Sequence, residues 1–288
     1  MRIKKIFAEY RQAEVVAANL SSKTFESYFY AEKLVVDFFG DIELGKLRPE
    51  DVRAFYEHLL GWQKPDTARG NIVCLRSVIK YAKRRGLKVM SPEDIKVPKR
   101  EKRTIEYLTQ SEVEEFVAVV GQPMRGYSRV NRVRNVLIVE LLYATGLRVS
   151  ELCRLNRNSF RDRQTVVVGK SKMPRPVYIT KEVEELIDKY LKLRTDSSVA
   201  LLVSEQTGER IKPGTIRRVF ANACDRSEFS GVHPHTLRHS FATKMLTEGV
   251  NLRYIADLMG HESLDTTKIY THYTNPQLRS IYENVWRT

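Results

Sequence analysis

Residues 136–152 read VLIVELLYATGLRVSEL, a long apolar run followed by a glycine and a short charged segment. The run from Val136 to Tyr143 predicts a long, buried helix. Gly146 would let the chain turn after this helix, and either Thr145 or Ser150 can start the next one. The stretch therefore predicts a core helix, a tight turn and a second helix.

Arg148 and Glu151 follow this turn three residues apart, so on a helix they would share a face. Taken alone, such a pair is typical of a surface ion pair worth roughly a few tenths of a kcal/mol. An arginine is also well suited to hold a phosphate, because its planar fork donates to two oxygens at once. Arg148 can therefore belong either to a surface ion pair or to a phosphate site.

Beyond this stretch the sequence predicts two short strands and further helices. The β-prone segments Thr165–Val168 and Arg175–Ile179 flank the turn GKSKMP at 169–174, which predicts a β-hairpin. Helices are expected to resume near Lys181 and again from Ile216. No internal repeat or low-complexity segment interrupts the pattern.

The first hundred residues are predicted to be helical. Ser21 or Ser22 can cap a helix that ends at Gly40, and Pro49 and Pro65 stand where two further helices would begin. The three expected apolar faces consist of Phe25, Tyr28, Phe29, Leu34, Val35 and Phe38, of Val52, Phe55, Tyr56, Leu59 and Leu60, and of Ile72, Leu75, Val78, Ile79 and Ala82.

Residues 92–106 break this helical pattern with two prolines and the run KREKR, and they predict a basic linker. We therefore expect a helical domain over residues 1–91 and a second domain over residues 107–288. Thr109 and Glu112 have the spacing of a capping box, so the first helix of the second domain should begin there.

The charge of the chain favours a polyanionic partner. It carries 49 Lys and Arg against 35 Asp and Glu, a net charge of +14, with a pI near 9.6. Nucleic acid is the obvious partner, although a merely basic protein would have the same composition. The cluster of Lys80, Lys83, Arg84 and Arg85 allows the same two interpretations, a solvated helix end or a surface that grips a DNA backbone.

The composition also argues against several classes of protein. The chain is 42% hydrophobic and 29% charged, which is typical of a globular protein and not of a disordered one. No apolar run is long enough to span a bilayer, and the first residues lack a secretory signal, so we expect a cytosolic protein. Cys74, Cys153 and Cys224 are isolated, which favours reduced thiols over a disulfide or zinc framework.

Further segments hold side chains suited to phosphate chemistry. Lys170, in the expected hairpin turn, could protonate a leaving oxygen, with Lys172 as an equal competitor. His235 and Arg238 would share a helical face. His235 and His239 also have the i,i+4 spacing of a zinc site, but the glutamate of a metalloprotease motif is missing and an arginine lies between them.

The last candidates lie near the C-terminal end. His261 closes the segment LMGH at 258–261, and Tyr270 follows nine residues later. Taken alone, Tyr270 is typical of an amphipathic structural tyrosine. Five of the six histidines lie between His233 and His272, however, and this clustering favours a shared site. The residues alone thus indicate a basic protein with a candidate phosphate-transfer site.

Taken in order, these segments resemble the tyrosine recombinase (phage integrase) family, close to its Xer branch of chromosome-dimer resolvases. The resemblance rests on Ala144–Leu152, on His235–Arg238 with SFAT at 240–243, and on Leu258–Tyr270, in the family's order and spacing. It covers most of residues 106–273 and extends more weakly to the first domain. The abundant Lys, Arg and Glu with few Gln suggest a heat-adapted source, and the resemblance to Xer resolvases is compatible with an archaeal one.

The resemblance implies a mainly α fold. Its parts would be an N-terminal helical, SAM-like core-binding domain and an α+β catalytic domain with a small β-sheet. The family's activity is site-specific recombination of double-stranded DNA. By resemblance, Arg148 and Arg238 would bind the scissile phosphate, Tyr270 would attack it to form a 3′-phosphotyrosyl bond, and Lys170 would protonate the leaving 5′ oxygen.

The same resemblance assigns three supporting residues. His235 would assist proton transfer, His261 would donate a hydrogen bond to a phosphate oxygen, and Glu151 would orient the neighbouring catalytic groups. Because the energy of the broken bond is kept in the phosphotyrosine, the resemblance implies no cofactor, neither ATP nor a metal.

The C-terminal tail carries one apolar stripe at helical spacing, made of Leu278, Ile281, Tyr282, Val285 and Trp286. Such a helix can pack against its own domain or, as in the family, dock in a groove of a neighbouring subunit. We expect four subunits on two DNA sites, with this tail docking in trans and strands exchanged through a Holliday junction.

Several alternatives to this function remain. The compact length favours chromosome-dimer resolution, and with it chromosome partition at cell division, over DNA integration by a mobile element. A type IB topoisomerase shares the phosphotyrosine chemistry but relaxes DNA as a monomer. A DNA-binding relative that has lost catalysis is the non-enzymatic alternative, and the full catalytic set argues against it.

Overall fold

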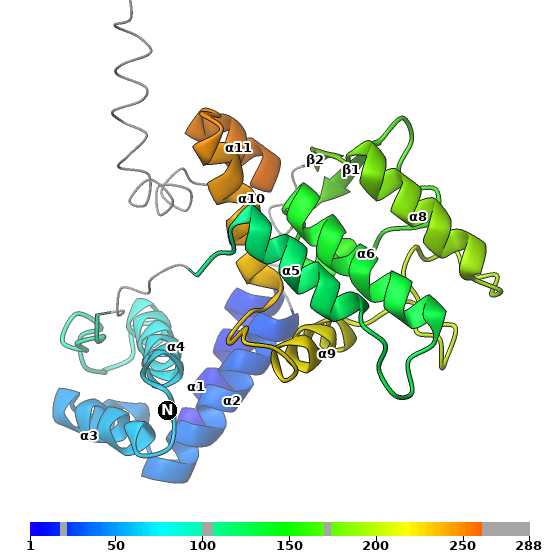
Figure 1. Cartoon of the computed structure of the whole chain (residues 1–288). Coiled ribbons are helices and arrows are strands. Elements are labelled where there is room, and N and C mark those ends of the chain that lie inside the picture. The colour runs from blue at the N-terminus through cyan, green and yellow to red at the C-terminus, as the bar shows by residue number, and fades with distance from the viewer. Residues whose placement is uncertain (18–21, 100–105, 170–173, 261–288) are drawn as a thin grey trace, which may run out of the picture. The chain divides into compact units, whose positions relative to one another are not determined.

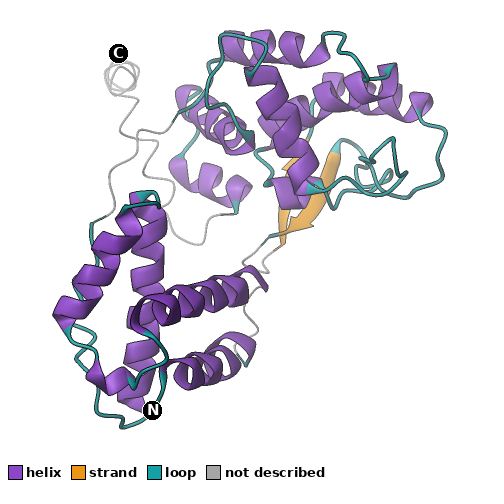
Figure 2. Ribbon diagram, turned by 90° about the horizontal axis from the view of Figure 1, so that it is seen from below, coloured by secondary structure: helices purple, strands orange, loops and turns teal. Residues whose placement is uncertain are grey.

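The computed structural model describes residues 1–17, 22–99, 106–169 and 174–260. Over these residues the protein is mainly helical with one two-stranded sheet (Figure 1, Figure 2), as the predicted fold class requires. The chain divides into two compact units, Met1–Arg103 and Thr104–Thr288. The dividing point lies within the expected linker over 92–106, part of which is outside the described residues.

The first unit is built of helices around a single apolar core. Its elements are α1 (Ile3–Tyr10), a π-helical segment (Arg11–Val16), α2 (Ser22–Phe39), a 3₁₀ turn (Leu44–Lys46), α3 (Pro49–Leu60) and α4 (Pro65–Arg84). As predicted, prolines open α3 and α4, where a missing N–H costs nothing. Gly40 follows the end of α2 with a φ of +74°.

The face that α2 buries differs from the predicted one. Ala31 is fully buried, whereas Phe25, Phe29 and Phe38 keep 38%, 58% and 38% of their surface exposed. The π-helical segment, which the sequence did not predict, packs beside α2. From this segment Arg11 lies over the rings of Phe25 and Phe29, at 5.5 and 5.4 Å from their centroids. These two rings therefore cover a cation instead of entering the core.

The second unit is organised around one helix. Its elements are α5 (Gln110–Gly121), α6 (Arg129–Thr145), α7 (Val149–Leu152), β1 (Gln164–Val168), β2 (Pro174–Tyr178), α8 (Lys181–Leu193), α9 (Pro213–Cys224), α10 (Pro234–Thr247) and α11 (Leu252–Met259). Figure 1 shows α6 between α5 and α8. The fully buried side chains of α6 are Leu137, Ile138, Val139, Leu141 and Leu142. A helix that is apolar on so many sides belongs in the middle of a core, as predicted.

Two local features hold the site-bearing elements in place. Thr109 and Glu112 form the predicted capping box, with the Thr109 N–H donating to the Glu112 carboxylate at 2.7 Å. One residue earlier, the N–H of Leu108 donates to Ser240 Oγ at 2.8 Å, which ties the start of α5 to α10.

The predicted hairpin is confirmed to within one residue. β1 and β2 pair antiparallel, with Gln164 opposite Tyr178 and Val168 opposite Pro174. Side chains alternate along β2, so Arg175 is buried while its neighbours in the strand are exposed. The turn between the strands, residues 170–173, lies outside the described residues.

Candidate active site

The candidate site forms where five segments of the second unit meet. They are the turn between α6 and α7, the end of β1, the start of β2, the first turns of α10 and the C-terminal end of α11. α10 packs against α6, and α11 packs against both α10 and β2. Segments that are distant in the sequence thereby reach one place.

Gly146 shapes the first of these segments. It turns the chain at the end of α6, as predicted, and does so in the left-handed conformation, with a φ of +59°. A Cβ at this position would lie 2.6 Å from the ring of Phe241 in α10, so only glycine allows the two elements this close. The carbonyl of Gly146 accepts a hydrogen bond from Arg238 Nη1. The turn at Gly146 therefore lets α6 approach α10 closely and also provides a hydrogen-bond acceptor for Arg238.

The cap of α7 differs from the prediction. The N-cap residue is Arg148, not Thr145 or Ser150, and its N–H donates to Glu151 Oε2 at 2.9 Å. The hydroxyl of Thr145 donates instead to the carbonyl of Leu141, one turn earlier in α6. The carboxylate of Glu151 thus begins the helix and fixes the backbone of Arg148 at the same time.

The Glu151 carboxylate is buried between two arginines. Only 1% of its side chain is exposed, and it pairs with Arg148 Nη1 at 2.9 Å and with Arg175 Nη2 at 2.7 Å. Burial alone would raise the pKa of this carboxyl, but the Arg148 N–H and the two guanidinium groups outweigh burial and lower the pKa. The pair is therefore not the surface ion pair that spacing alone suggests.

Arg148 and Arg238 converge on one turn. Arg148 Nη2 donates to the carbonyl of Gly260 at 3.0 Å, and Arg238 Nη2 donates to the carbonyl of Met259 at 2.5 Å. Arg238 is 5% exposed, whereas 28% of the Arg148 side chain faces solvent. Two guanidinium groups from different elements thus lie at adjacent peptides, and one of them is open to a ligand.

The histidines of α10 lie in a positive environment. His235 is exposed to solvent, yet the protein around its ring lowers its pKa by desolvation, and His233, Arg238 and Arg148 lower it further. Burial, followed by the interactions with His235, Arg238 and His233, lowers the pKa of His239 to about 4. At neutral pH both imidazoles are therefore neutral, and His235 can accept a proton.

The residues that the structure describes contain no group of three or more His, Cys, Asp or Glu side chains that could hold a metal ion. Within that part of the chain, the zinc hypothesis for His235 and His239 has no third ligand. Cys74, Cys153 and Cys224 are free, and burial raises the pKa of Cys74 and Cys153 to about 11, so both remain thiols. Among the described helices, none has the length and apolarity needed to cross a membrane.

Four candidates lie outside the described residues: Lys170, Lys172, His261 and Tyr270. The C-terminal tail over residues 275–288 lies outside them as well. The structure therefore tests the positions of Arg148, Glu151, His235 and Arg238 and leaves the roles of all predicted site residues as expectations.

Gly169 and Gly260 are the last described residues before two segments that hold predicted site residues. A Cβ on Gly169, at the end of β1, would lie 2.9 Å from Glu151 Oε1 and 3.1 Å from Arg148 Nη1. Gly260, at the end of α11, has a φ of +63°, and its carbonyl is the acceptor for Arg148. The chain thus passes directly over the Arg148–Glu151 pair just before the predicted hairpin turn.

The structure adds one charged residue to the site. The sequence marked Arg175 only as the start of a strand, but its side chain is 6% exposed and pairs with Glu151. Its position in the strand could have revealed it, because Arg175 has the same parity as the buried Val177. A lone arginine on the inward face of a strand needs a buried partner.

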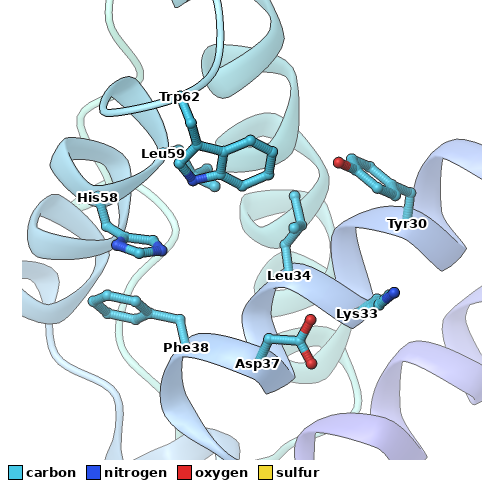
Figure 3. A pocket seen from close by; sticks show the side chains of 8 residues that line it. All are labelled: Tyr30, Lys33, Leu34, Asp37, Phe38, His58, Leu59 and Trp62. Atoms are coloured by element: carbon cyan, nitrogen blue, oxygen red, sulfur yellow. The ribbon is translucent and has the colours of Figure 1, made fainter.

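A separate hollow of about 480 Å³ lies on the first unit, away from these residues. Figure 3 shows it between the side chains of α2 and those at the end of α3. The ring of His58 lies 4.9 Å from that of Phe38, and the lining also includes the charged side chains of Lys33 and Asp37. With one cation beside one anion, this hollow lacks the surplus of positive charge that a phosphate site needs.

Known proteins are similar to this chain over the second unit and, in some cases, over nearly its whole length. Residues 106–276, which span the predicted site from Arg148 to Tyr270, match the phage integrase family. The tyrosine recombinase XerC of Bacillus subtilis is 32% identical over 300 residues, covering 96% of this chain and 94% of that protein. The tyrosine recombinase XerA of Thermococcus kodakarensis is 40% identical over 196 residues, 66% of each chain.

A solved structure supports the fold. The Tn1549 transposon integrase, determined in complex with transposon right end DNA, superposes with a TM-score of 0.81 and covers 100% of both chains. At 16% identity, this likeness concerns the fold alone.

Proposed function

This chain belongs to the phage integrase family of tyrosine recombinases, and we propose that it is a site-specific recombinase of Xer type that cuts and rejoins double-stranded DNA. The observation that carries the proposal is the meeting of Arg148 and Arg238 at adjacent carbonyls of one turn. Paired guanidinium groups beside an exposed surface are suited to the oxygens of a single phosphate.

In the proposed complex, Arg148 and Arg238 bind the non-bridging oxygens of the scissile phosphate. Each guanidinium group has five N–H donors. Arg148 can therefore keep its contacts to Glu151 and Gly260, and Arg238 those to the carbonyls of Gly146 and Met259, while donating to the phosphate. The negative charge that develops as phosphorus becomes pentacovalent is then stabilised by donors already in place. Glu151 supports this step by holding Arg148 through both its backbone N–H and its side chain.

We assign the covalent step to Tyr270. Its phenolic oxygen attacks phosphorus, the bond to the 5′ oxygen breaks, and a 3′-phosphotyrosyl bond forms. Lys170 gives a proton to the leaving 5′ oxygen, and His235 takes part in transferring the phenolic proton. The closeness of Gly169 to the Arg148–Glu151 pair supports the role of Lys170, the next residue. His261, which follows Gly260, donates a hydrogen bond to a phosphate oxygen.

Rejoining runs the same step in reverse. A 5′ hydroxyl of the partner strand attacks the phosphotyrosine, and the tyrosine leaves. The number of phosphoester bonds is unchanged in each step, so the proposed reaction includes neither ATP nor a metal.

We propose further that four subunits act on two DNA sites and that the tail over residues 275–288 docks on a neighbouring subunit. A groove of about 580 Å³ on the second unit, between α5, α6, α8 and α10, fits such a tail. Its apolar lining includes Val113, Ala144, Val183, Leu186, Phe241 and Met245, and its acidic lining consists of Glu114, Glu140 and Glu182. The tail offers the complement, an apolar stripe together with Arg279 and Arg287.

Trapping of the covalent intermediate tests the proposed reaction. The DNA sequence that the protein protects on its source chromosome is mapped first, and a duplex with that sequence is nicked beside the cleavage position. The full chain should form a covalent adduct with this suicide substrate, and Tyr270→Phe should bind the DNA without forming one. Absence of any adduct with the native chain would leave a DNA-binding protein without catalysis.

A second assay separates a recombinase from a type IB topoisomerase. Supercoiled plasmid that lacks the mapped site should be relaxed poorly, because a recombinase cleaves only within an assembled complex on its site. Rapid relaxation of that plasmid by the monomer would favour the topoisomerase.

Removal of residues 275–288 tests docking of the tail. The shortened chain should keep its thermal stability but lose cooperative assembly on DNA, as measured by native gel shift. Glu182→Lys, in the groove, should weaken assembly as well, whereas Glu185→Lys, an exposed charge outside the groove, should not. Unchanged assembly of the shortened chain would rule out docking in trans.

For the biological role we propose resolution of chromosome dimers in the cytoplasm, where the chromosomal substrate lies. The similarity to Xer recombinases over nearly the whole chain supports this role over integration of a mobile element.

A further inference from the structure

Arg175 joins three segments of the site. It lies in β2, directly after the hairpin turn, and donates from Nη2 to Glu151 Oε2 at 2.7 Å. From Nη1 it donates to the carbonyl of Leu258 at 2.5 Å, one residue before the two carbonyls that hold Arg238 and Arg148. One side chain thus connects the hairpin, the carboxylate that orients Arg148 and the C-terminal turn of α11.

Gly260 packs directly on this side chain. A Cβ at Gly260 would lie 2.8 Å from Arg175 Cδ and 2.9 Å from Arg175 Nε, closer than real Cβ atoms approach. The turn therefore rests on the stem of the arginine, and its carbonyl is aimed at Arg148 from there. The position of Arg175 consequently affects the acceptors of the phosphate-binding arginines as well as their carboxylate.

The buried guanidinium group of Arg175 is costly for the stability of the fold. Burial lowers the pKa of Arg175, and the attraction to Glu151 offsets this lowering only in part. Desolvation therefore makes a cation unfavourable at this position. Within the described residues, Nε finds no hydrogen-bond acceptor. An apolar side chain of similar size would fill the space without these costs. What it would lack is the two-pronged link between Glu151 and Leu258.

We propose that Arg175 is a positioning residue for strand cleavage. It holds the Glu151 carboxylate ionised and aimed at Arg148, and it fixes the end of α11, so that Arg148 and Arg238 stay aligned on one phosphate. This inference rests on the phosphate-binding role proposed above for those two arginines.

Two variants separate the charge of Arg175 from its forked shape. In Arg175→Lys the charge remains, but a lysine has no planar fork with which to contact Glu151 and the Leu258 carbonyl together. In Arg175→Met both charge and fork are lost, and the pKa of Glu151 should rise because an opposite charge at close range is gone. Arg194→Met is the matched control, since Arg194 is equally buried and ion-paired but lies outside the site.

The measurement is the single-turnover rate of adduct formation on the nicked suicide substrate, at saturating DNA, over a pH range that extends from pH 9 to below the ordinary pKa of a glutamate, about 4.3. Arg175→Lys should be about tenfold slower than the native chain, with the affinity for DNA nearly unchanged and the acid limb of the pH profile in place. Arg175→Met should be slower still, with the acid limb moved up by about one pH unit. In a Glu151→Gln background, Arg175→Met should move the limb no further.

The outcomes are distinguishable. Thermal unfolding and DNA affinity of each variant show whether it folds, and Arg175→Lys carries the test if Arg175→Met does not. The inference fails if the Arg175 variants keep the native rate and acid limb while losing only stability, as Arg194→Met should. A native chain that forms no adduct would instead refute the proposed function, and the inference with it.

Discussion

Two arginine–carboxylate clusters in the second unit contain ion pairs of opposite orientation. At the candidate site, the Glu151 side chain is 1% exposed and that of Arg148 is 28% exposed. Around Asp196 the order is reversed, since the carboxylate is 28% exposed and the Arg194 side chain is 1% exposed. The exposed partner is therefore the guanidinium group in the first pair and the carboxylate in the second, where Arg157 also pairs with Asp196 and is 33% exposed.

The reach of the contacts differs as well. Arg194 donates to Asp196 and to the carbonyls of Ala200 and Leu201, at 2.6 and 2.8 Å, all within seven residues of itself. Arg148 contacts a carbonyl 112 residues away. Arg194 therefore holds its own loop, whereas Arg148 joins distant segments and keeps 28% of its side chain exposed. The comparison teaches that the orientation of an ion pair, more than its presence, marks a binding site.

The largest expected effect comes from exchanging lysine for arginine in both clusters. Arg148→Lys should slow adduct formation about 100- to 1000-fold, because a preorganised donor to the developing charge is lost. Arg194→Lys should leave that rate nearly unchanged but lower the free energy of unfolding by about 2 kcal/mol, since buried carbonyls lose their donors. Single-turnover cleavage and urea unfolding measure the two effects. Equal losses of rate would remove the distinction between the clusters.

A second effect concerns acid stability near the site. The pKa of His239 in the folded protein is about 4, well below the usual value near 6.5. Between pH 6.5 and pH 4 this side chain is therefore protonated in the unfolded chain but neutral in the folded protein. Stability should therefore fall between pH 6.5 and pH 4, by about 2 kcal/mol from this residue. Urea unfolding across this range should show the loss in the native chain and a flatter profile in His239→Gln. Parallel profiles would contradict the assignment.

The third effect is steric. Gly169→Ala would bring a methyl group within 2.9 Å of Glu151 Oε1 and should slow adduct formation about tenfold by displacing the pair. Gly214→Ala is the control, because a Cβ there meets nothing within 4 Å. The control should keep the native rate and gain up to about 1 kcal/mol from the reduced freedom of the unfolded chain. Equal rates in the two variants would show that the space beside Glu151 is unimportant.

The smallest effect belongs to the Asp196 cluster. The hydrogen bonds from Arg194 lower the pKa of Asp196, so its stabilising contribution is present above pH 4 and is lost as the pH falls further. Asp196→Asn should cost about 1 kcal/mol at pH 7, a modest value because the carboxylate is partly solvated. Unfolding at pH 7 and at pH 3 should show that the deficit shrinks in acid. A deficit that is the same at both pH values would point to a cause other than charge.

Local signals predicted much of the fold. The capping box at Thr109, the turn at Gly146, the prolines that open α3 and α4 and the β-hairpin are all confirmed, because each depends on residues close together in the sequence. Two predictions were wrong. The sequence assigned Phe25 and Phe29 of α2 to a core face, whereas both rings cover Arg11 of the π-helical segment. It also missed Glu151 as the partner that caps α7.

For the candidate site, the sequence supplied the residue types but not their arrangement. It named Arg148, Glu151, His235 and Arg238, and family resemblance assigned their roles. It did not single out Arg175, because an arginine at the start of a strand has no distinguishing neighbours until β2 is paired and packed.

The amino-acid sequence by itself determined the helices, the hairpin, the positive charge and the order of the family's motifs, since these depend on composition and on contacts a few residues long. Only the tertiary structure decided which charges face solvent and which carbonyls the arginines hold. Burial and hydrogen-bond geometry depend on segments far apart in the chain, and packing of α11 against α10 and β2 brings those segments together.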